Sequence, residues 1–470
     1  MAGLVGTAAH AETLADAIAL AYQTNPTLQE QRALQRALDE NYVQARTGLR
    51  PSASVSISVT TTNTDPQTLF STPNPENSSA TTLSINQPVY TGGRVSTQIA
   101  AAEADVLGGR ENLRRTEEAI LGNVIQAYVD VRRDQERLRI AQENVTVLAR
   151  QLEETKARFD VGELTRTDVA QAEARLAAAQ AGLSSAQAQL AISRAEYAAV
   201  VGQSPGDLAA EPSLANLLPA TVDEAFDAAE KNNPQILAAD YTEQGSRARV
   251  AFARAGYLPS VSLRASYGDS GFAGNNGSPF DNNSRALSAS VAATVPLFTG
   301  GLTESQVRQA KERNNGDRLN IEVTRRTVLQ SVSQAWNQLL GARANLISTQ
   351  EEVRAATVAF EGVRQEAQVG LRTTLDVLNA EQELRTAELD LANAKHDEYV
   401  ASASVLSAMG KLEAHNLTPD VPIYDPKTSF DKVNHSWGWV PWEGAVHALD
   451  KIGAPGIGPA PADTPVATAK

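Results

Sequence analysis

Cysteine is absent from the chain of 470 residues, which excludes disulfide bonds, zinc–thiolate sites and thiol nucleophiles. A run of about 18 apolar residues, the length that a membrane-spanning helix needs, is also missing. A β-barrel stays possible, because each of its strands needs only about 10 alternating residues. The formal net charge of −14 disfavours nucleic acid and anionic membrane surfaces as partners.

Sites for catalysis are missing as well. The sequence has no phosphate-binding loop, no dinucleotide fingerprint and no nucleophile elbow. Its histidines lack the spacing of metal ligands, and we expect them on solvated surfaces: His10, His396, His415, His435 and His447. We therefore expect no enzymatic activity, no cofactor and no metal. Energy for any transport must then come from a partner protein.

Residues 1–11 are expected to be the remnant of a secretory signal. Met1–Val5 is apolar, and Ala9–Ala11 fits the rule of small residues before a cleavage site, which leaves Glu12 as the first mature residue. A plain flexible terminus is the alternative. Export would place the protein in the periplasm or beyond, and a Glu rather than a Cys after the cut predicts no lipid attachment there.

An internal repeat with a constant offset of 208 residues is the most informative feature of the sequence. The matching pairs are Asn25-Pro26 with Asn233-Pro234, Pro51-Ser52 with Pro259-Ser260, Pro88–Gly93 with Pro296–Gly301, Gln126–Tyr128 with Gln334–Trp336, Val161-Gly162 with Val369-Gly370, and Val201-Gly202 with Met409-Gly410. Chance similarity would not keep one register over so many positions. We therefore expect two copies of one structural unit, residues 12–208 and 209–413, followed by a C-terminal segment, residues 414–470.

Each repeat is predicted to contain a long helical hairpin. Proline is absent from residues 90–204 and 297–418, and apolar residues step by seven through both stretches. The ladders of repeat 1 are Val124, Val131, Leu138, Val145, Leu152 and Phe159, and then Val169, Leu176, Leu183, Leu190 and Tyr197. The counterparts in repeat 2 keep the pattern, with a break at Glu398. We interpret the ladders as core packing between helices, the first of which, Arg94–Phe159, would be roughly 100 Å long.

Ahead of each hairpin lies a predicted pair of strands with alternating apolar and small polar residues. The apolar positions are Val55, Ile57 and Val59, then Leu83 and Ile85, and in repeat 2 Val261–Tyr267 and Leu287–Leu297. This alternation suits strands with one face on lipid and one on water. The links 63–80 and 268–284 are rich in Asn, Ser, Gly and Pro and are expected to be exposed loops.

Four strands per chain cannot close a transmembrane barrel, which needs at least about eight. An open edge in lipid would leave backbone groups without partners at a cost of several kcal/mol each. The chain must therefore oligomerise if these strands lie in a membrane. The physical argument alone leaves two, three or four copies open.

Two units of strand pair plus long hairpin, the Pro-(Val/Leu)-(Tyr/Phe)-Thr-Gly-Gly junctions and the Val-Gly-x-x-Thr-x-x-Asp tips resemble the TolC family of outer-membrane channels over residues 12–413. The resemblance implies an α+β membrane protein. Three chains of four strands each would form a 12-stranded β-barrel in the outer membrane, and this barrel would continue into a long α-helical periplasmic tunnel. The junction residues between barrel and tunnel would be Pro88, Gly92, Gly93, Pro296, Gly300 and Gly301.

The resemblance also implies a passive exit duct for export. A periplasmic adaptor and an inner-membrane ABC transporter, or another pump, would dock at the tip of the tunnel of this homotrimer, and outer-membrane lipid would surround its barrel. The start at Glu12 and the Tyr-Thr-Gly-Gly-Arg junction are similar to the type I protein-secretion branch, with small-molecule efflux as the alternative. A periplasmic adaptor would have one hairpin interrupting a β domain, and a trimeric adhesin would have one continuous stalk, so both fit the repeat less well.

The hairpin tips concentrate the candidate site residues. The expected left-handed helix ends are Gly162 and Gly370, and the expected capping boxes are Thr165–Asp168 and Thr373–Asp376. Helix capping alone would account for both aspartates. The resemblance implies in addition that Asp376 belongs to an acidic ring at the periplasmic entrance, which would favour cations.

Further gate residues follow from the same resemblance. Thr167, Asp168 and Arg372 match positions that link neighbouring hairpins in the family. Asn379 stands where the family has a second ring aspartate, so the ring would carry less charge. Ala367 replaces an aromatic residue that helps to close the entrance, although Phe159 keeps an aromatic in repeat 1.

The C-terminal segment departs from the repeats and carries three of the four tryptophans: Trp437, Trp439 and Trp442. We expect these side chains to pack onto a belt around the middle of the tunnel. A docking patch for another protein is the alternative. The tail from about Gly453 is rich in Ala, Pro and Gly and is expected to be disordered.

Overall fold

The computed structural model describes residues 11–64, 74–274, 278, 280, 283–418, 421–434 and 438–458. The predicted signal remnant up to His10, Trp437 and the end of the C-terminal tail lie outside the described residues. The chain divides into two compact units, each of which is described by itself. One comprises residues 1–33, 111–237 and 323–424, and the other comprises residues 34–110, 238–322 and 425–470.

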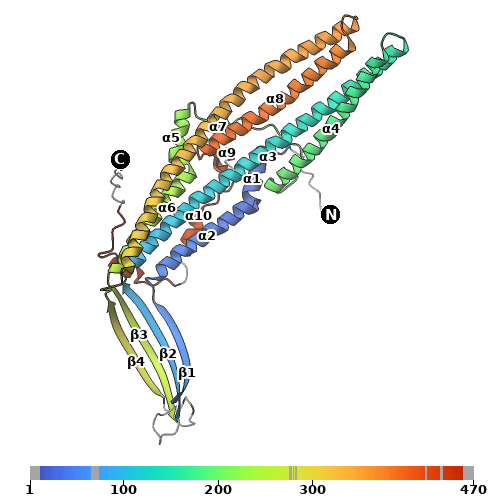
Figure 1. Ribbon diagram of the computed structural model, residues 1–470. Helices are drawn as coiled ribbons and strands as arrows, with labels where there is room; N and C mark the ends of the chain where they lie inside the picture. The colour runs from blue at the N-terminus through green and yellow to red at the C-terminus, as the bar shows by residue number, and fades with distance from the viewer. Residues whose placement is uncertain are drawn as a thin grey trace, which may run out of the picture. The chain divides into compact units, whose positions relative to one another are not determined.

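The elements follow one another in the same order in the two repeats. Repeat 1 contains α1 (Leu14–Thr24), α2 (Pro26–Thr47), β1 (Ser52–Thr64), β2 (Asn74–Tyr90), α3 (Arg94–Asp160) and α4 (Arg166–Val201). Repeat 2 contains α5 (Val222–Asn232), α6 (Pro234–Arg254), β3 (Ser260–Gly274), β4 (Ser284–Thr294), α7 (Leu302–Gln368) and α8 (Thr374–Ala408). Short helices follow at α9 (Ala414–Leu417), α10 (Pro426–Asn434) and α11 (Glu443–Asp450), and single turns lie at Ala215–Leu217 and Ala255–Tyr257. Figure 1 shows α3 with α4, and α7 with α8, as two long hairpins.

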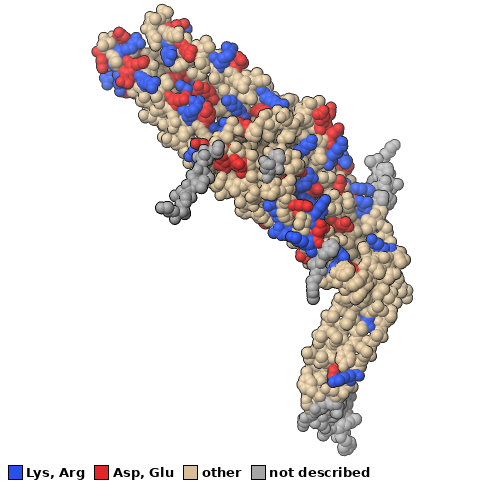
Figure 2. All heavy atoms as spheres, turned by 180° about the vertical axis from the view of Figure 1, so that it is seen from behind, with Lys and Arg blue, Asp and Glu red and all other residues tan. Residues whose placement is uncertain are grey.

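The four strands form one antiparallel sheet in the order β1-β2-β3-β4 (Figure 1). The register places Val55 opposite Leu83, Leu83 opposite Tyr267 and Tyr267 opposite Leu287, so one apolar row crosses all four strands. Val55 and Leu287 are 64% and 79% exposed, which means that this row has no cover from its own chain. On the face drawn in Figure 2, charged side chains are dense on the helices and sparse on the sheet. The predicted alternation of the strands is therefore confirmed.

The strands differ from the sequence prediction at their ends. β1 continues to Thr64, β2 begins at Asn74 and β3 continues to Gly274, inside the predicted loops, because the polar residues there still pair their backbone groups across the ladder. β4 ends at Thr294, so Val295 and Leu297 do not continue it. Proline has no N–H to donate to a ladder, and the chain has left the sheet before it reaches Pro296.

The heptad ladders form the core of the hairpins. Val124, Val131, Val332 and Leu339 are at most 1% exposed and belong to one apolar cluster. Towards the tips the cover thins, and Phe159 is 40% exposed. Both α3 and α7 have 67 residues, which corresponds to about 100 Å at a rise of 1.5 Å per residue. No helix within the described part of the chain is both long and apolar enough to cross a membrane.

The C-terminal segment packs at the junction of β2 and α3. Asp450 is fully buried there and accepts hydrogen bonds from the Thr91 N–H at 2.6 Å and the Ser96 N–H at 3.1 Å, as well as from both hydroxyls at 2.7 Å. Burial alone would raise the pKa of Asp450, but these hydrogen bonds outweigh it and hold the pKa below 3.8. The carboxylate thus caps the positive end of α3 from a distant part of the sequence.

A buried ion pair holds the other end of α11. Glu443 accepts hydrogen bonds from Arg46 at 2.6 Å and from Arg50 at 3.0 Å. Arg46 lies in the last turn of α2, and Arg50 follows that helix. The inward face of α11 thus consists of Glu443, Val446 and Asp450, at helical spacing. The two described tryptophans lie off this face: Trp439 and Trp442 are 58% and 49% exposed, and Trp442 donates to Gln87 at 3.1 Å. Their predicted packing onto a belt around the middle of the tunnel stays a prediction.

Removal of the Asp450 charge is expected to destabilise the unit that contains the sheet. Asp450→Asn should lower its free energy of unfolding by about 1–3 kcal/mol at pH 7, because buried N–H and O–H donors lose a charged acceptor. The pKa of Asp450 is depressed, so the difference should persist above pH 3.8 and shrink as the pH falls below it. Thermal unfolding in detergent measures the effect, with the exposed Asp227→Asn as the control. Equal stability of the two variants would contradict the capping role.

Candidate entrance at the hairpin tips

Each hairpin turns through a glycine with a left-handed backbone. Gly162 has φ 84° and Gly370 has φ 82°, a region that other residues rarely adopt. The N–H of Gly162 donates to the carbonyl of Phe159, and the N–H of Glu163 donates to the carbonyl of Arg158, both at 2.9 Å. The same pair of bonds closes α7, from Gly370 and Leu371. These are the bonds of a Schellman motif, so the predicted helix ends are confirmed.

A capping box then begins the next helix of each hairpin. The Thr165 N–H and hydroxyl donate to Oδ2 of Asp168 at 2.9 and 2.7 Å, and the Asp168 N–H is directed back to the hydroxyl at 3.4 Å. Thr373 and Asp376 repeat this geometry at 3.0, 2.8 and 3.2 Å. The predicted boxes are confirmed in both hairpins.

The capping bonds also keep both carboxylates ionised. The side-chain hydrogen bond from Thr165 is the largest cause of the lowered pKa of Asp168, and the backbone hydrogen bond from Thr373 is the largest cause of the lowered pKa of Asp376. In each box the bonds go to Oδ2, so Oδ1 points away from the cap. A capping aspartate can therefore also present a negative charge to an ion at the tip.

Arg372 pairs within its own tip. Its Nε donates to Glu366 at 2.8 Å, with both side chains about half exposed. A contact from Arg372 to Thr167 or Asp168 is not found among the described residues. A link of this kind between two copies of the chain stays a prediction, as does the acidic ring.

A polar bridge that the sequence analysis missed joins the two hairpins. The guanidinium of Arg175, on α4, donates to Oδ1 of Asn379 at 3.2 Å and also to Gln382, both on α8. Beside it the buried side chains of Leu148, Ala179 and Leu378 form a small apolar cluster. Asn379 is thus a hydrogen-bond acceptor at the seam between the hairpins, which we define as the contact of α8 with α3 and α4. The sequence held one indication that Arg175 has a role specific to repeat 1, because the equivalent residue in repeat 2 is an acid, Glu383.

Paired asparagines tie the base of each hairpin. The Asn25 amide donates to the carbonyl of Val200 at 3.0 Å and caps α2 by accepting from Thr27 at 3.0 Å. The Asn233 amide donates to the carbonyl of Ala408 at 2.9 Å and caps α6. This geometry explains the repeated Asn-Pro pair, because proline is well suited to the first position of a helix whose cap is asparagine.

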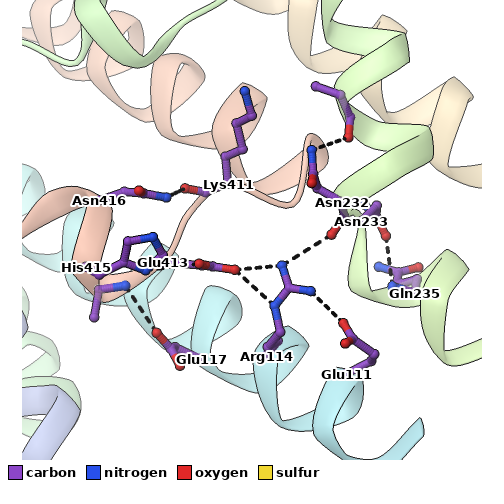
Figure 3. Close-up of polar contacts among 12 residues, drawn as sticks. Glu111, Arg114, Glu117, Asn232, Asn233, Gln235, Lys411, Glu413, His415 and Asn416 are labelled. Carbon is purple, nitrogen blue, oxygen red and sulfur yellow. Dashed lines mark hydrogen bonds and ion pairs between the residues drawn. The ribbon is translucent and has the colours of Figure 1, made fainter. Parts of the chain in front are cut away.

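An additional ionic cluster joins the residues that follow α8, in repeat 2, to α3, in repeat 1 (Figure 3). Arg114 donates to Glu413 at 2.6 Å, to Glu111 at 2.6 Å and to the carbonyl of Asn232 at 3.3 Å. Next to it the Ala414 N–H donates to Glu117 at 3.1 Å. Burial raises the pKa of the neighbouring Glu118 to about 8, so this cluster carries less negative charge than its acids suggest.

The glycines of the two strand-to-helix junctions all have positive φ: Gly92, Gly93, Gly300 and Gly301. In repeat 1 an added Cβ at Gly92 would lie 2.6 Å from Leu258, and one at Gly93 would collide with Ala454. The same atoms at Gly300 and Gly301 would meet open space. Pro88 lies at a shift in the register of β2. Only the junction of repeat 1 is therefore covered by its own chain.

Comparison with known proteins agrees with this architecture. The family model of outer membrane efflux proteins matches residues 17–203 and 225–411. The outer membrane efflux protein BepC of Brucella suis biovar 1 is 35% identical over 435 residues, which are 92% of this chain and 93% of that protein. The outer membrane protein TolC of Escherichia coli is 26% identical, with 87% and 84% covered. The alkaline protease secretion protein AprF of Pseudomonas aeruginosa is 27% identical, with 72% and 70% covered.

Solved structures share the fold. The CmeC outer membrane channel of Campylobacter jejuni superposes with a TM-score of 0.74 at 16% identity, over 90% of this chain and 89% of that one. The family model covers most of both repeats, and a relative above 30% identity covers nearly the whole chain. The chain therefore belongs to the TolC family of outer membrane efflux proteins, channels that are located in the outer membrane and extend into the periplasm.

Proposed function

We propose that the chain is one protomer of a homotrimeric, passive export duct. The observation that carries this proposal is the four-stranded sheet, which exposes an apolar row and has one unpaired edge at β1 and another at β4 among the described strands. In lipid such edges need partners, and copies of the same chain supply them. Three copies give 12 strands, the arrangement that the resemblance to the TolC family implies.

The periplasmic entrance lies, in this proposal, where the hairpin tips of the three copies meet. Asp376 from each copy would form a ring of charge, and a ring of carboxylates favours cations at a constriction. The bridge from Arg175 to Asn379 would hold the hairpins together in the resting state. Thr167, Asp168 and Arg372 would contribute links between copies.

Energy for transport would come from an inner-membrane ABC transporter or another pump, reached through a periplasmic adaptor. The described residues contain no cluster of three or more His, Asp or Glu side chains that could hold a metal ion. The duct itself would perform no chemistry and would need no cofactor.

Type I protein secretion is the proposed use of the duct. The Tyr-Thr-Gly-Gly-Arg junction supports it, and so does the similarity to a protein named for alkaline protease secretion. Small-molecule efflux is the second candidate. It is favoured by the similarity to BepC, which is named an efflux protein and matches over a larger share of the chain.

Deletion of the gene separates these two uses. Protein secretion predicts that one or a few large proteins disappear from the culture supernatant, as measured by quantitative mass spectrometry, and return on complementation. Efflux predicts an unchanged supernatant together with greater sensitivity to toxic small molecules. Deletion without either effect would argue against the export function itself.

Neutralisation of Asp376 is expected to reduce the preference of the channel for cations. In planar bilayers the ratio of cation to anion permeability of Asp376→Asn should fall toward one, because three charges leave the constriction. Thr373→Ala, which breaks the same capping box but keeps the charge of Asp376, controls for damage to the tip. An unchanged ratio in Asp376→Asn would remove Asp376 from the entrance.

Loss of the bridge between the hairpins is expected to open the channel more often. Arg175→Ala should shift the balance of closed and open states by about 1 kcal/mol, or roughly fivefold, because its partners are partly exposed amides. Single-channel recordings give the open fraction. Arg354→Ala, which removes an exposed ion pair on α7, should leave that fraction unchanged.

A further inference from the structure

A cavity of about 560 Å³ lies on the seam between the hairpins. Three helices line it: α3 between Asp134 and Leu148, α4 between Arg175 and Gln189, and α8 between Leu378 and Leu389. Part of the lining is apolar, and the rest consists of amides, hydroxyls and charged groups. The cavity therefore adjoins the bridge that Arg175 makes to α8, where a change of packing would separate α8 from α3 and α4.

Two buried carboxylates reach this cavity. Asp134 on α3 is 1% exposed, and Glu381 on α8 is 2% exposed. Oδ2 of Asp134 and Oε1 of Glu381 have no hydrogen-bond partner among the described residues. A buried ionised carboxylate without partners is costly, so each of these groups needs compensation.

Asp134 is compensated by ion pairs, whereas Glu381 has only the attraction of Arg385, which lowers its pKa by less than burial raises it. The carboxylate of Asp134 lies 3.1 Å from Arg133 and 3.8 Å from Arg137. For Glu381 no ion pair is found in the described part of the chain. The nearby Arg385 directs its guanidinium to Glu388 at 2.8 Å and to Glu143 at 3.6 Å instead.

The charges around the cavity decide what could satisfy Glu381. The charged side chains that line it besides Glu381 are Asp134 and Arg137 of α3, Arg175 of α4 and Arg385 of α8. Three guanidinium groups would repel a metal ion or an amine in the same space. A proton on the carboxyl removes the charge without adding a cation, and burial raises the pKa of Glu381 to about 7. A proton on Glu381 therefore fits these surroundings better than a bound cation.

We propose that Glu381 is a proton-binding latch on the seam: with its proton bound, α8 closes on α3 and α4, and loss of the proton loosens that contact. The position supports this role, because Glu381 lies one helical turn from Leu378, which is buried in the seam, and next to Gln382, which Arg175 contacts. The consequence for transport rests on the proposed function, but the latch itself does not.

The direction of the pH effect follows from linkage. In a loosened, hydrated seam the carboxyl would return towards its ordinary pKa of 4.5, whereas in the closed seam the pKa is about 7. Below 4.5 both states carry the proton, and pH has no effect. Between 4.5 and 7 each rise of one pH unit favours the loosened state by up to tenfold, and above 7 the effect is complete.

Spin labels on the two hairpins test the latch directly. The chain has no cysteine, so Ala181→Cys on α4 and Asp390→Cys on α8, both exposed, give one labelled pair per protomer. The distance between the labels in the full-length protein in detergent should lengthen or broaden as the pH rises from 5 to 8. Glu381→Gln should keep the short distance at every pH, because it is neutral throughout. Glu381→Met serves as a second neutral variant.

The matched control is Glu383→Gln, the same change at an exposed position two residues further on α8. It should keep the pH response of the unsubstituted chain. A response that persists in both neutral variants at 381, or a distance in the unsubstituted chain that does not change with pH, would overturn the latch.

Channel recordings over the same pH range separate the latch from the proposed function. A pH-dependent open fraction that Glu381→Gln abolishes would support both. A pH-dependent distance without any channel current would support the latch and contradict the export duct. Current whose pH dependence is the same in Glu381→Gln would contradict the latch and leave the duct in place.

Discussion

The requirement that every backbone N–H and C=O in a sheet find a partner governs this structure. One chain supplies four strands that pair with their neighbours in sequence order, and among the described residues the outer edges of β1 and β4 are open. The apolar row from Val55 to Leu287 is uncovered, so the sheet suits lipid, where open edges are most costly. A single chain with two open sheet edges therefore needs further copies of itself to pair those edges in lipid.

Duplication supplies the hairpins, and the differences between the two copies add the specific contacts. Both repeats use the same glycine turn, the same Thr–Asp box and the same asparagine at the base. Only the junction of repeat 1 receives the Asp450 carboxylate, and only the end of α8 is held by Arg114. Arg175 likewise contacts α8, while its counterpart in repeat 2 is the acid Glu383. A repeat sets the architecture, and single substitutions between its copies make one hairpin different from the other.

Sequence patterns with a local cause were predictable. The helix expected over Arg94–Phe159 ends one residue later, and both capping boxes form, because proline, glycine and threonine act within a few residues. Contacts between distant segments were not predictable. Asp450 and Thr91 lie 359 residues apart, and no periodicity indicates that one caps the helix of the other. The predicted loop boundaries were wrong for a related reason. The polar ends of β1 and β2 stay in the sheet because their backbones pair with each other, and composition alone does not indicate this pairing.

Two glutamates on α8 differ in the donors that surround their carboxylates. Glu398 interrupts the heptad ladder, yet it accepts from Ser402 at 3.2 Å and from Arg343 at 3.4 Å, so its charge is shared with donors on α8 and α7. Glu381 lies four residues after the ladder position Val377, on the same buried face, and no donor reaches its Oε1 in the described structure. The first glutamate is partly exposed, and two donors reach its carboxylate. For the second, burial in the closed packing disfavours the charged form, and this conflict is the physical basis of the proposed response of the seam to pH.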